Sequence, residues 1–212
     1  KERAALIGAR AVFRAQPGRP PGPPLQADAE PEVVGRGLST THLTVVDADG
    51  NAVAMTTSIE QAFGSHLMVG GFLLNNQLTD FSFVPASGGQ PFPNRAAPGK
   101  RPRSSMAPTL VFDGDGRLLL GLGSPGGSRI IDYVAQTVIG VLDWRLDIQG
   151  AIDLPHVVNR NGPTELEAGT AIEALKPALE ALGHSVVGRE LDSGINAVAV
   201  TAKGLVGGSD RR

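Results

Sequence analysis

The sequence predicts an α+β sandwich in which strands outnumber helices. Three observations lead to this prediction: two hairpin patterns, one long helical pattern and a pair of closing strands, with strands and helices in separate runs along the chain. At 212 residues, 41% of them hydrophobic, the chain is long enough for one domain with a substantial core.

The first elements are a short helix, a linker and a hairpin. Residues 2–14 have a spacing suited to a helix. The tract "QPGRPPGPPLQADAEPE" that follows cannot continue it, because proline lacks an N–H and clashes with the preceding turn. We expect an extended linker there. Residues 41–47 and 52–58 then alternate like strands around the turn pair Asp49-Gly50.

The second half repeats this logic and adds helices. A hairpin is predicted from residues 108–113 and 117–123 around a Gly-Asp-Gly turn. Residues 128–144 predict a buried helix, because apolar residues recur at helical spacing and Ser128 is available as a cap. That apolar set is Ile131, Val134, Val138 and Leu142. The remaining predictions are helices at 147–153 and 170–182, the latter ending at Gly183, and strands at 196–200 and 204–208.

Composition excludes several classes of protein. The formal net charge is −2 and the basic residues are scattered, so no nucleic-acid partner is expected. Cysteine is absent and the four histidines are not at metal-ligand spacing, so we expect neither a metal nor another cofactor. The longest apolar stretch, residues 130–142, is too short to span a bilayer. The chain begins at Lys1 without a leader, so we expect it to be part of a longer product.

A glycine-rich loop at residues 121–127 matches G-x-G-x-x-G between a strand and a helix. A dinucleotide fold would need a second strand ending in an acidic residue after that helix, and the pattern offers none, so nucleotide binding is disfavoured. Gly126 and Gly127 could instead direct backbone N–H groups at a developing oxyanion. The alternative is a plain tight turn.

Other polar residues have simple explanations. His42 falls in an alternating strand, where a structural histidine is the favoured interpretation, and Asp47 and Asp49 flank a turn that they would help to form. The run Ser39-Thr40-Thr41 has two interpretations. It is ordinary at a strand start, but a threonine freed as an N-terminus would carry its own general base.

Four motifs, in this order, resemble the small subunit of the γ-glutamyltranspeptidases together with the end of their large subunit: "TTHLTVVDADGNAVAMTTS", "LLNNQLTDFS", "KRPRSSMAPTLV" and "GSPGGSRI". The resemblance implies an N-terminal nucleophile hydrolase, a four-layer αββα sandwich completed by a large subunit. Residues 1–39 would be the tail of that large subunit with its Pro-rich linker, and residues 40–212 the small catalytic subunit. The two would form a heterodimer cut from one precursor, working in the periplasm or outside the cell.

The resemblance also implies roles for single residues. The precursor would be cut between Ser39 and Thr40, and Thr40 would be the nucleophile, its freed α-amine acting as general base. Ser58 takes the place of a threonine that hydrogen-bonds the nucleophile, and Gly126 and Gly127 match the oxyanion hole. The substrate contacts would be Gln77 and Asp80 for the α-amino group and Ser104 and Ser105 for the α-carboxylate. The simpler alternatives are that Asp80 caps a turn and that the serines end a loop.

The implied activity is γ-glutamyl hydrolysis or transfer on glutathione-like amides through an acyl-enzyme. Glu60 departs from the family, which usually has Asn there. Beside a substrate α-carboxylate its charge would be repulsive and would shift the enzyme towards hydrolysis or another acyl group. Pointing at the α-amino group alongside Asp80, it would preserve affinity for glutamyl substrates. The loop 85–100 is also short for a lid. The alternatives are a glutaryl (cephalosporin-type) acylase and an unprocessed, non-catalytic precursor fragment.

Overall fold

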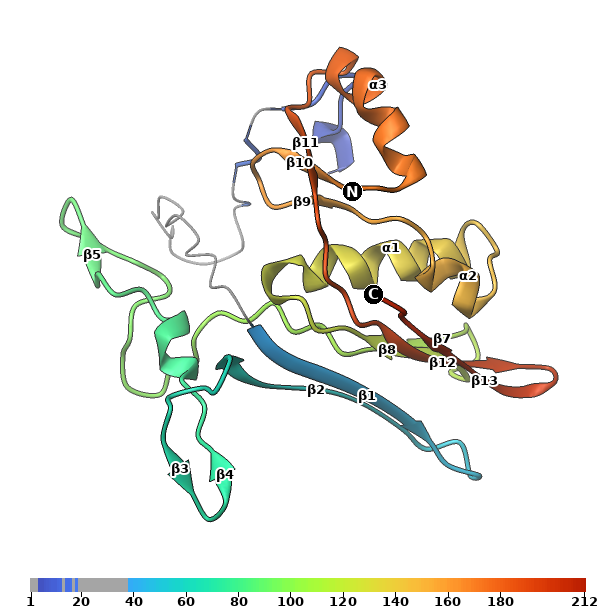
Figure 1. Cartoon of the computed structure of the whole chain (residues 1–212), viewed down its shortest axis with the longest axis horizontal. Helices are drawn as coiled ribbons and strands as arrows, with labels where there is room; N and C mark the ends of the chain where they lie inside the picture. Colours follow the sequence, from blue (N-terminus) through green and yellow to red (C-terminus); the bar gives the residue numbers. More distant parts are fainter. Residues whose placement is uncertain (1–3, 13, 17, 19–37) are drawn as a thin grey trace. The chain divides into compact units, whose positions relative to one another are not determined.

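A computed structural model describes residues 4–12, 14–16, 18 and 38–212, with backbone only for residues 38 and 39. The described part divides into two compact units. The first unit contains the described residues up to 18 and residues 42–56 and 106–212, and the second contains residues 38–41 and 57–105. Figure 1 labels the elements, and each unit is described by itself. The predicted Pro-rich linker lies outside the described residues.

A four-stranded antiparallel sheet forms the centre of the first unit, with the order β13-β12-β8-β7. Its strands are β7 (Thr109–Phe112), β8 (Leu118–Gly123), β12 (Asn196–Thr201) and β13 (Gly204–Ser209). These are the strands that the second hairpin and the closing pair predicted. Helices α1 (Ile130–Leu142) and α2 (Ile148–Ile152) lie along one face of this sheet (Figure 1).

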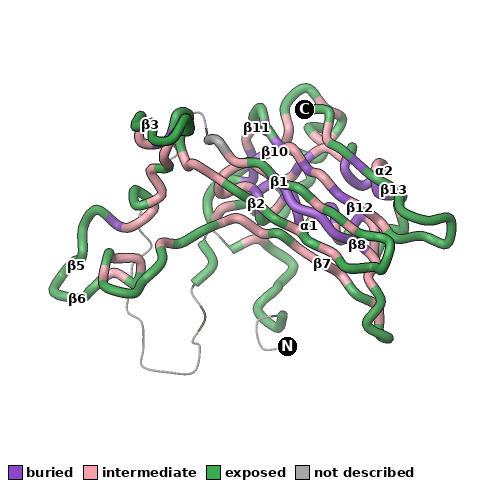
Figure 2. Tube along the Cα trace, turned by 90° about the horizontal axis from the view of Figure 1, so that it is seen from below, coloured by how far each residue is buried: buried purple, intermediate pink, exposed green. Residues whose placement is uncertain are grey.

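The core lies between the sheet and these helices. Leu120 and Leu122 of β8 have no exposed surface and pack in one cluster with Ile130, Tyr133 and Ile152. Figure 2 shows the buried residues gathered on β8, β12, α1 and α2. Burying a leucine or isoleucine side chain stabilises the fold by about 1.5–3 kcal/mol.

The part of the first hairpin that belongs to the first unit, residues 42–56, packs on the opposite face of the sheet. The hairpin consists of β1 (Leu38–Val46) and β2 (Ala52–Gln61), as predicted. The Asp47 carboxylate closes its turn by accepting hydrogen bonds from the backbone N–H groups of Asp49 and Asn51. Successive strand residues point to opposite faces, so Gly121 and Gly123 of β8 meet the hairpin while Leu120 and Leu122 meet the helices. The first unit therefore contains hairpin, sheet and helices, which are three of the four predicted layers.

A smaller sheet, which the sequence did not predict, has the order β11-β10-β9. It is made of β9 (Val157–Asn159), β10 (Thr164–Glu167) and β11 (Val186–Arg189), and the pair β10–β11 is parallel. The connection between these two strands contains the 3₁₀ helix η4 (Ala171–Leu175) and helix α3 (Lys176–Ala181). The predicted helix 170–182 is thus confirmed but divided at Lys176, where α3 begins with Pro177 in its first turn.

Two helix predictions need correction. The predicted helix 2–14 is, among its described residues, only the 3₁₀ turn η1 (Ala4–Leu6), because this short segment contains Gly8 and is almost wholly exposed. In α1 the buried stripe is Ile130, Tyr133, Val134 and Thr137, whereas Ile131 is 55% exposed. Ser128 makes no cap there; it lies inside the 3₁₀ helix η3 (Gly127–Arg129) and accepts a hydrogen bond from Arg160.

The second unit is built from short elements. Two small hairpins, β3 (Met68–Val69) with β4 (Phe72–Leu73) and β5 (Ala86–Ser87) with β6 (Gln90–Pro91), flank the 3₁₀ helix η2 (Gln77–Asp80). No helix in the part of the chain that the structure describes has the length and apolar character to cross a bilayer.

One buried polar chain in the first unit fixes a histidine in its neutral form. His156 Nε2 lies 2.7 Å from Ser193 Oγ, and Ser193 donates its own proton to Asp210. The Ser193 oxygen must therefore accept the Nε2 proton, so the proton of His156 is on Nε2. Nδ1 is buried without a hydrogen-bond partner among the described residues. Burial first, and the charge of Arg212 second, lower the pKa of His156 from 6.5 to about 4.

This depressed pKa predicts acid sensitivity. In the unfolded chain His156 binds a proton as the pH falls below 6.5, whereas in the folded chain it binds one only near pH 4. The free energy of unfolding should therefore fall by about 3 kcal/mol across that window. We expect His156→Gln, which keeps a donor towards Ser193, to have a flatter profile in urea unfolding measured from pH 7 to pH 4.5. The exposed His66→Gln serves as the control, and parallel profiles for all three proteins would contradict the prediction.

Candidate active site

Thr40 lies in β1 with its hydroxyl facing Ser58 of β2. Thr40 Oγ1 is 3.0 Å from Ser58 Oγ, and the backbone N–H of Glu60 donates to that same oxygen at 2.9 Å. The two hydroxyl residues line a hollow of ≈ 400 Å³ together with Thr41, Thr57 and Ile59. Thr40 is therefore oriented by a neighbouring hydroxyl and opens onto a space that an acyl group can enter. The bond between Ser39 and Thr40 lies inside β1.

Glu60, Gln77 and Asp80 form one cluster. Gln77 Nε2 donates to Glu60 Oε2 at 3.2 Å and to Asp80 Oδ2 at 2.6 Å. Glu60 has a positive φ of 73°, a conformation that few residues other than glycine adopt, and Gln77 and Asp80 are the two ends of η2. A single amide between two carboxylates leaves this cluster able to bind a cation. The simpler interpretation of Asp80 as a turn cap does not account for its side-chain contact with Gln77.

The electrostatics of this cluster follow from its burial. Desolvation raises the pKa of the Glu60 carboxyl, the negative charge of Asp80 raises it further, and the hydrogen bond from Gln77 opposes both effects. A positively charged group beside the two carboxylates would lower the pKa of Glu60 again.

Ser104 and Ser105 are connected to the cluster through a residue that the sequence did not single out. Asn94 Nδ2 donates to the backbone oxygen of Asp80 at 2.6 Å, and Asn94 Oδ1 accepts from the backbone N–H of Arg103 at 2.9 Å. Ser104 is exposed and Ser105 half-buried in the irregular segment that follows. Asn94 thereby ties the segment with the two serines to η2. Its sequence neighbourhood, "PFPNRAAPG", is typical of a loop and gave no hint of this bridging role.

Gly126 and Gly127 belong to the first unit, between β8 and α1. Their φ angles are 132° and 59°, so both lie in the region that favours glycine. A Cβ on Gly126 would be 2.6 Å from Cε2 of Tyr133. Within the described part of the chain, neither backbone N–H has a recorded partner. Gly126 and Gly127 therefore form a tight turn, and their two backbone N–H groups are available to donate hydrogen bonds.

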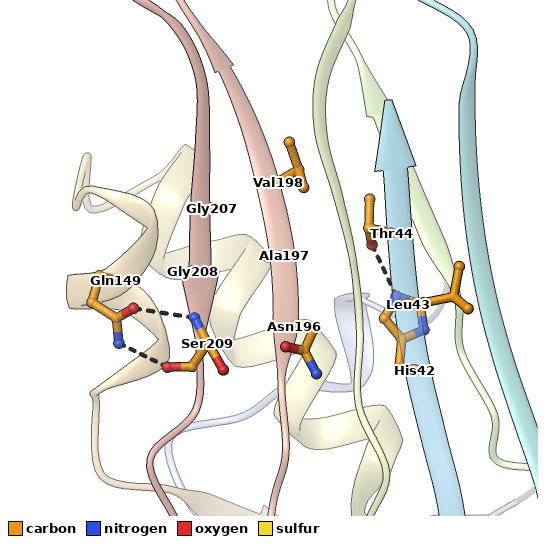
Figure 3. Close-up of a pocket in the computed structure, with 10 residues that line it drawn as sticks. All are labelled: His42, Leu43, Thr44, Gln149, Asn196, Ala197, Val198, Gly207, Gly208 and Ser209. Carbon is orange, nitrogen blue, oxygen red and sulfur yellow. Dashed lines mark hydrogen bonds between the residues drawn. The ribbon is translucent and has the colours of Figure 1, made fainter. Parts of the chain in front are cut away.

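The remaining candidates lie elsewhere. His42 is buried, with Nδ1 2.8 Å from Thr56 Oγ1 and Nε2 3.0 Å from Thr44 Oγ1, which confirms a structural histidine. Burial lowers the pKa of His42. A second hollow, of ≈ 520 Å³, lies beside it over β12 and β13, and Figure 3 shows Gln149 bridging to Ser209 at its edge. Of the candidates considered, His42 alone lines this hollow, and no group of three potential metal-ligating side chains occurs among the residues described.

The mixed α+β fold of this chain is that of the N-terminal nucleophile hydrolases, because solved structures of that class resemble it. The chain aligns with a Helicobacter pylori gamma-glutamyltranspeptidase mutant with a TM-score of 0.72 and 34% identity, covering 81% of this chain and 98% of that one. It aligns with cephalosporin acylase from Bacillus halodurans with a TM-score of 0.77 and 25% identity, covering 99% of this chain and 36% of that one.

Sequence comparisons identify the family. The profile described as Gamma-glutamyltranspeptidase matches residues 1–212, and the glutathione hydrolase proenzyme of Escherichia coli (strain K12) is 42% identical over 185 residues, 82% of this chain. The chain belongs to the gamma-glutamyltranspeptidase family. The Acylase ACY 1 proenzyme of Pseudomonas sp. (strain SE83) is 36% identical over 82% of this chain. The chain spans 31% of the length of each of these two relatives.

Proposed function

We propose that this chain is the catalytic part of a γ-glutamyl hydrolase or transferase that acts on glutathione-like amides. The observation that carries the proposal is the unbroken chain of contacts from Thr40 through Ser58 and Glu60 to Gln77 and Asp80. It joins a nucleophile to a cation site, and a γ-glutamyl group offers both a carbonyl to attack and an ammonium to bind. The names of the relatives add independent support.

The proposed chemistry has two stages. In the precursor, Thr40 Oγ1 attacks the carbonyl carbon of Ser39, and the peptide C–N bond breaks, which frees the α-amine of Thr40 and leaves an ester on Oγ1. Water then hydrolyses this ester, which releases the Ser39 carboxylate and restores the Thr40 hydroxyl. In the mature enzyme, that amine takes the proton from Oγ1 as the hydroxyl attacks the γ-carbonyl. The tetrahedral oxyanion is stabilised by the N–H groups of Gly126 and Gly127. Its collapse breaks the C–N bond of the substrate, and the leaving amine takes the proton back from the Thr40 ammonium. Water or an amino acid then attacks the ester.

The position of Glu60 favours the second of its two expected roles. Because Glu60 shares Gln77 with Asp80, we assign it to the substrate α-amino group and not to the α-carboxylate. Ser104 and Ser105, held beside η2 by Asn94, remain the proposed carboxylate contacts. The acylase alternative predicts no need for a cation site, since a glutaryl group has no amine.

The rest of the precursor is the proposed partner. The outer face of the hairpin carries Leu43, Val45, Val53 and Met55, each between 40% and 55% exposed. A row of apolar residues on one strand face is ordinarily covered. We propose that the large subunit covers it as the fourth layer, and that the heterodimer works in the periplasm or outside the cell.

The function is tested with the full-length product and two anilides. Wild type should hydrolyse γ-glutamyl p-nitroanilide and contain a chain beginning at Thr40 by mass spectrometry. Glu60→Asn should lower kcat/KM for this substrate by about tenfold, because it removes one charge from the ammonium site, and should leave glutaryl p-nitroanilide unaffected or improved. Asp49→Asn, a charge change in the turn of the same hairpin, is the control.

Three outcomes would count against this proposal. Preference of the wild type for the glutaryl anilide would favour the acylase. A gain of γ-glutamyl activity in Glu60→Asn would indicate that Glu60 lies near the substrate α-carboxylate, where its negative charge repels the substrate. A wild type that is never cut and never turns over either anilide would favour the non-catalytic precursor fragment.

A further inference from the structure

Glu165 of β10 is a buried carboxylate that receives three arginines. Its side chain is 7% exposed; Oε2 lies 2.7 Å from Arg129 Nε, and Oε1 lies 3.1 Å from both Arg160 Nη2 and Arg189 Nε. Arg129 and Arg160 are each 19% exposed, whereas Arg189 is 56% exposed. One anion thus organises two largely buried cations and one exposed cation.

Both buried arginines reach the segment that contains the two glycines. We call residues 126–129 the glycine loop. Arg129 is its last residue, and Arg160 Nη1 donates to Ser128 Oγ at 2.8 Å. Glu165 is therefore linked to Ser128 through Arg160, and to Arg129 directly. On the other side of the loop, the ring of Tyr133 lies against Gly126. Arg189 touches the same carboxylate from β11, and the contacts among the described residues include none between Arg189 and the loop.

The charge of Glu165 is stabilised by its arginine partners. Burial alone would raise the pKa of the Glu165 carboxyl, but the hydrogen bond and charge of Arg129, followed by those of Arg160, lower the pKa below its ordinary value. Glu165 is therefore ionised throughout the neutral range. A buried guanidinium that loses its carboxylate is strongly disfavoured, so Arg129 and Arg160 have little freedom to move away.

We propose that Glu165 is a positioning residue for catalysis, which fixes the glycine loop through Arg129 and through Arg160 and Ser128. The inference rests on the proposed function, since it concerns the N–H groups that would stabilise the oxyanion. Such groups act only when they are held at hydrogen-bond distance from the position that the oxyanion will occupy, and a loop with two positive-φ glycines has little rigidity of its own. The ion cluster supplies that rigidity.

Three variants of the full-length protein test this role. Glu165→Gln removes the anchor, Ser128→Ala cuts only the Arg160 contact with the loop, and Arg189→Gln removes one cation from the same carboxylate without touching the loop. Activity is expressed per chain beginning at Thr40, so that a processing defect is not mistaken for slow turnover. For γ-glutamyl p-nitroanilide we expect kcat to fall about tenfold or more in Glu165→Gln and about threefold in Ser128→Ala, with KM within about twofold of wild type.

A second readout does not depend on activity. Hydrogen–deuterium exchange of the peptide covering residues 121–131 should be faster in Glu165→Gln and in Ser128→Ala, while the β7–β8 turn at 113–117 keeps its wild-type rate. Arg189→Gln should change neither kcat nor this exchange. An Arg189→Gln variant that loses as much turnover as Glu165→Gln, or a cut Glu165→Gln with wild-type kcat and exchange, would overturn the inference.

The test separates this inference from the proposed function. A wild type without turnover would refute the function, and the exchange comparison would still decide whether Glu165 holds the loop. If Glu165→Gln does not fold, Ser128→Ala and Arg129→Met decide the question, because each cuts one connection on the loop side. Ser128→Ala leaves Glu165 with three arginines, and Arg129→Met leaves it with two. Wild-type exchange in both would overturn the inference.

Discussion

Thr40→Ala should leave the precursor uncut and without measurable turnover. The bond before Thr40 lies in β1, and in the proposed mechanism the hydroxyl that attacks it is the one held 3.0 Å from Ser58 Oγ. Alanine removes the attacking atom for both stages, and without the cut no α-amine exists to act as base. Mass spectrometry should find only full-length chain, and γ-glutamyl p-nitroanilide should remain intact.

The conservative variant Thr40→Ser provides the matched comparison, because it keeps a hydroxyl at the same position. It should still be cut and should turn over substrate. A Thr40→Ala protein that is cut between Ser39 and Thr40 would show that another group performs the cleavage. The autocatalytic mechanism would then be wrong, whatever the substrate.

Gly127→Val should lower kcat by roughly two to three orders of magnitude with a much smaller effect on KM. The φ of Gly127 is 59°, which a β-branched residue adopts only with strain, so the backbone would turn and carry the two N–H groups away from the oxyanion. Interactions made only in the transition state appear in kcat, because the bound substrate does not use them.

Gly116→Val separates this effect from strain alone. Gly116 has a φ of 79° in the turn between β7 and β8, and a side chain there would meet open space. The two variants therefore impose the same kind of backbone penalty at different places. Comparable losses of turnover in both would assign Gly127 to the turn and remove it from the oxyanion hole.

The parts of the fold that could be predicted are those specified by neighbouring residues. Both hairpins follow from strict alternation around Asp49-Gly50 and Gly114–Gly116, and α1 follows from its apolar spacing. The sheet of β9, β10 and β11 could not be predicted in this way, because its three- and four-residue strands are too short to establish a period and its parallel pair joins residues about twenty positions apart. The helix prediction for residues 2–14 failed for the opposite reason: its described residues are almost all exposed, and helical spacing without a buried face does not stabilise a helix.

The candidate site also contains residues that could be predicted from the sequence and residues that could not. Thr40, Ser58, Gln77 and Asp80 were named from motif resemblance, and the structure joins them in one hydrogen-bonded series. The direction in which Glu60 points could not be read from the sequence, because it depends on a positive φ and on the position of η2. Asn94 and Glu165 were missed since each acts through a contact between segments distant in sequence.

The glycines of β8 limit how this protein can be redesigned. A Cβ on Gly121 would be 2.7 Å from Cγ2 of Thr44, and one on Gly123 would overlap the imidazole ring of His42. Both partners lie on β1, the strand that carries Thr40. A mutation chosen to add bulk to the sheet would therefore push on the strand of the proposed nucleophile, and we expect it to lower activity through a residue outside the proposed substrate contacts. Libraries for new acyl specificity should keep residues 121 and 123 as glycine and place their diversity at residues 60, 77 and 94.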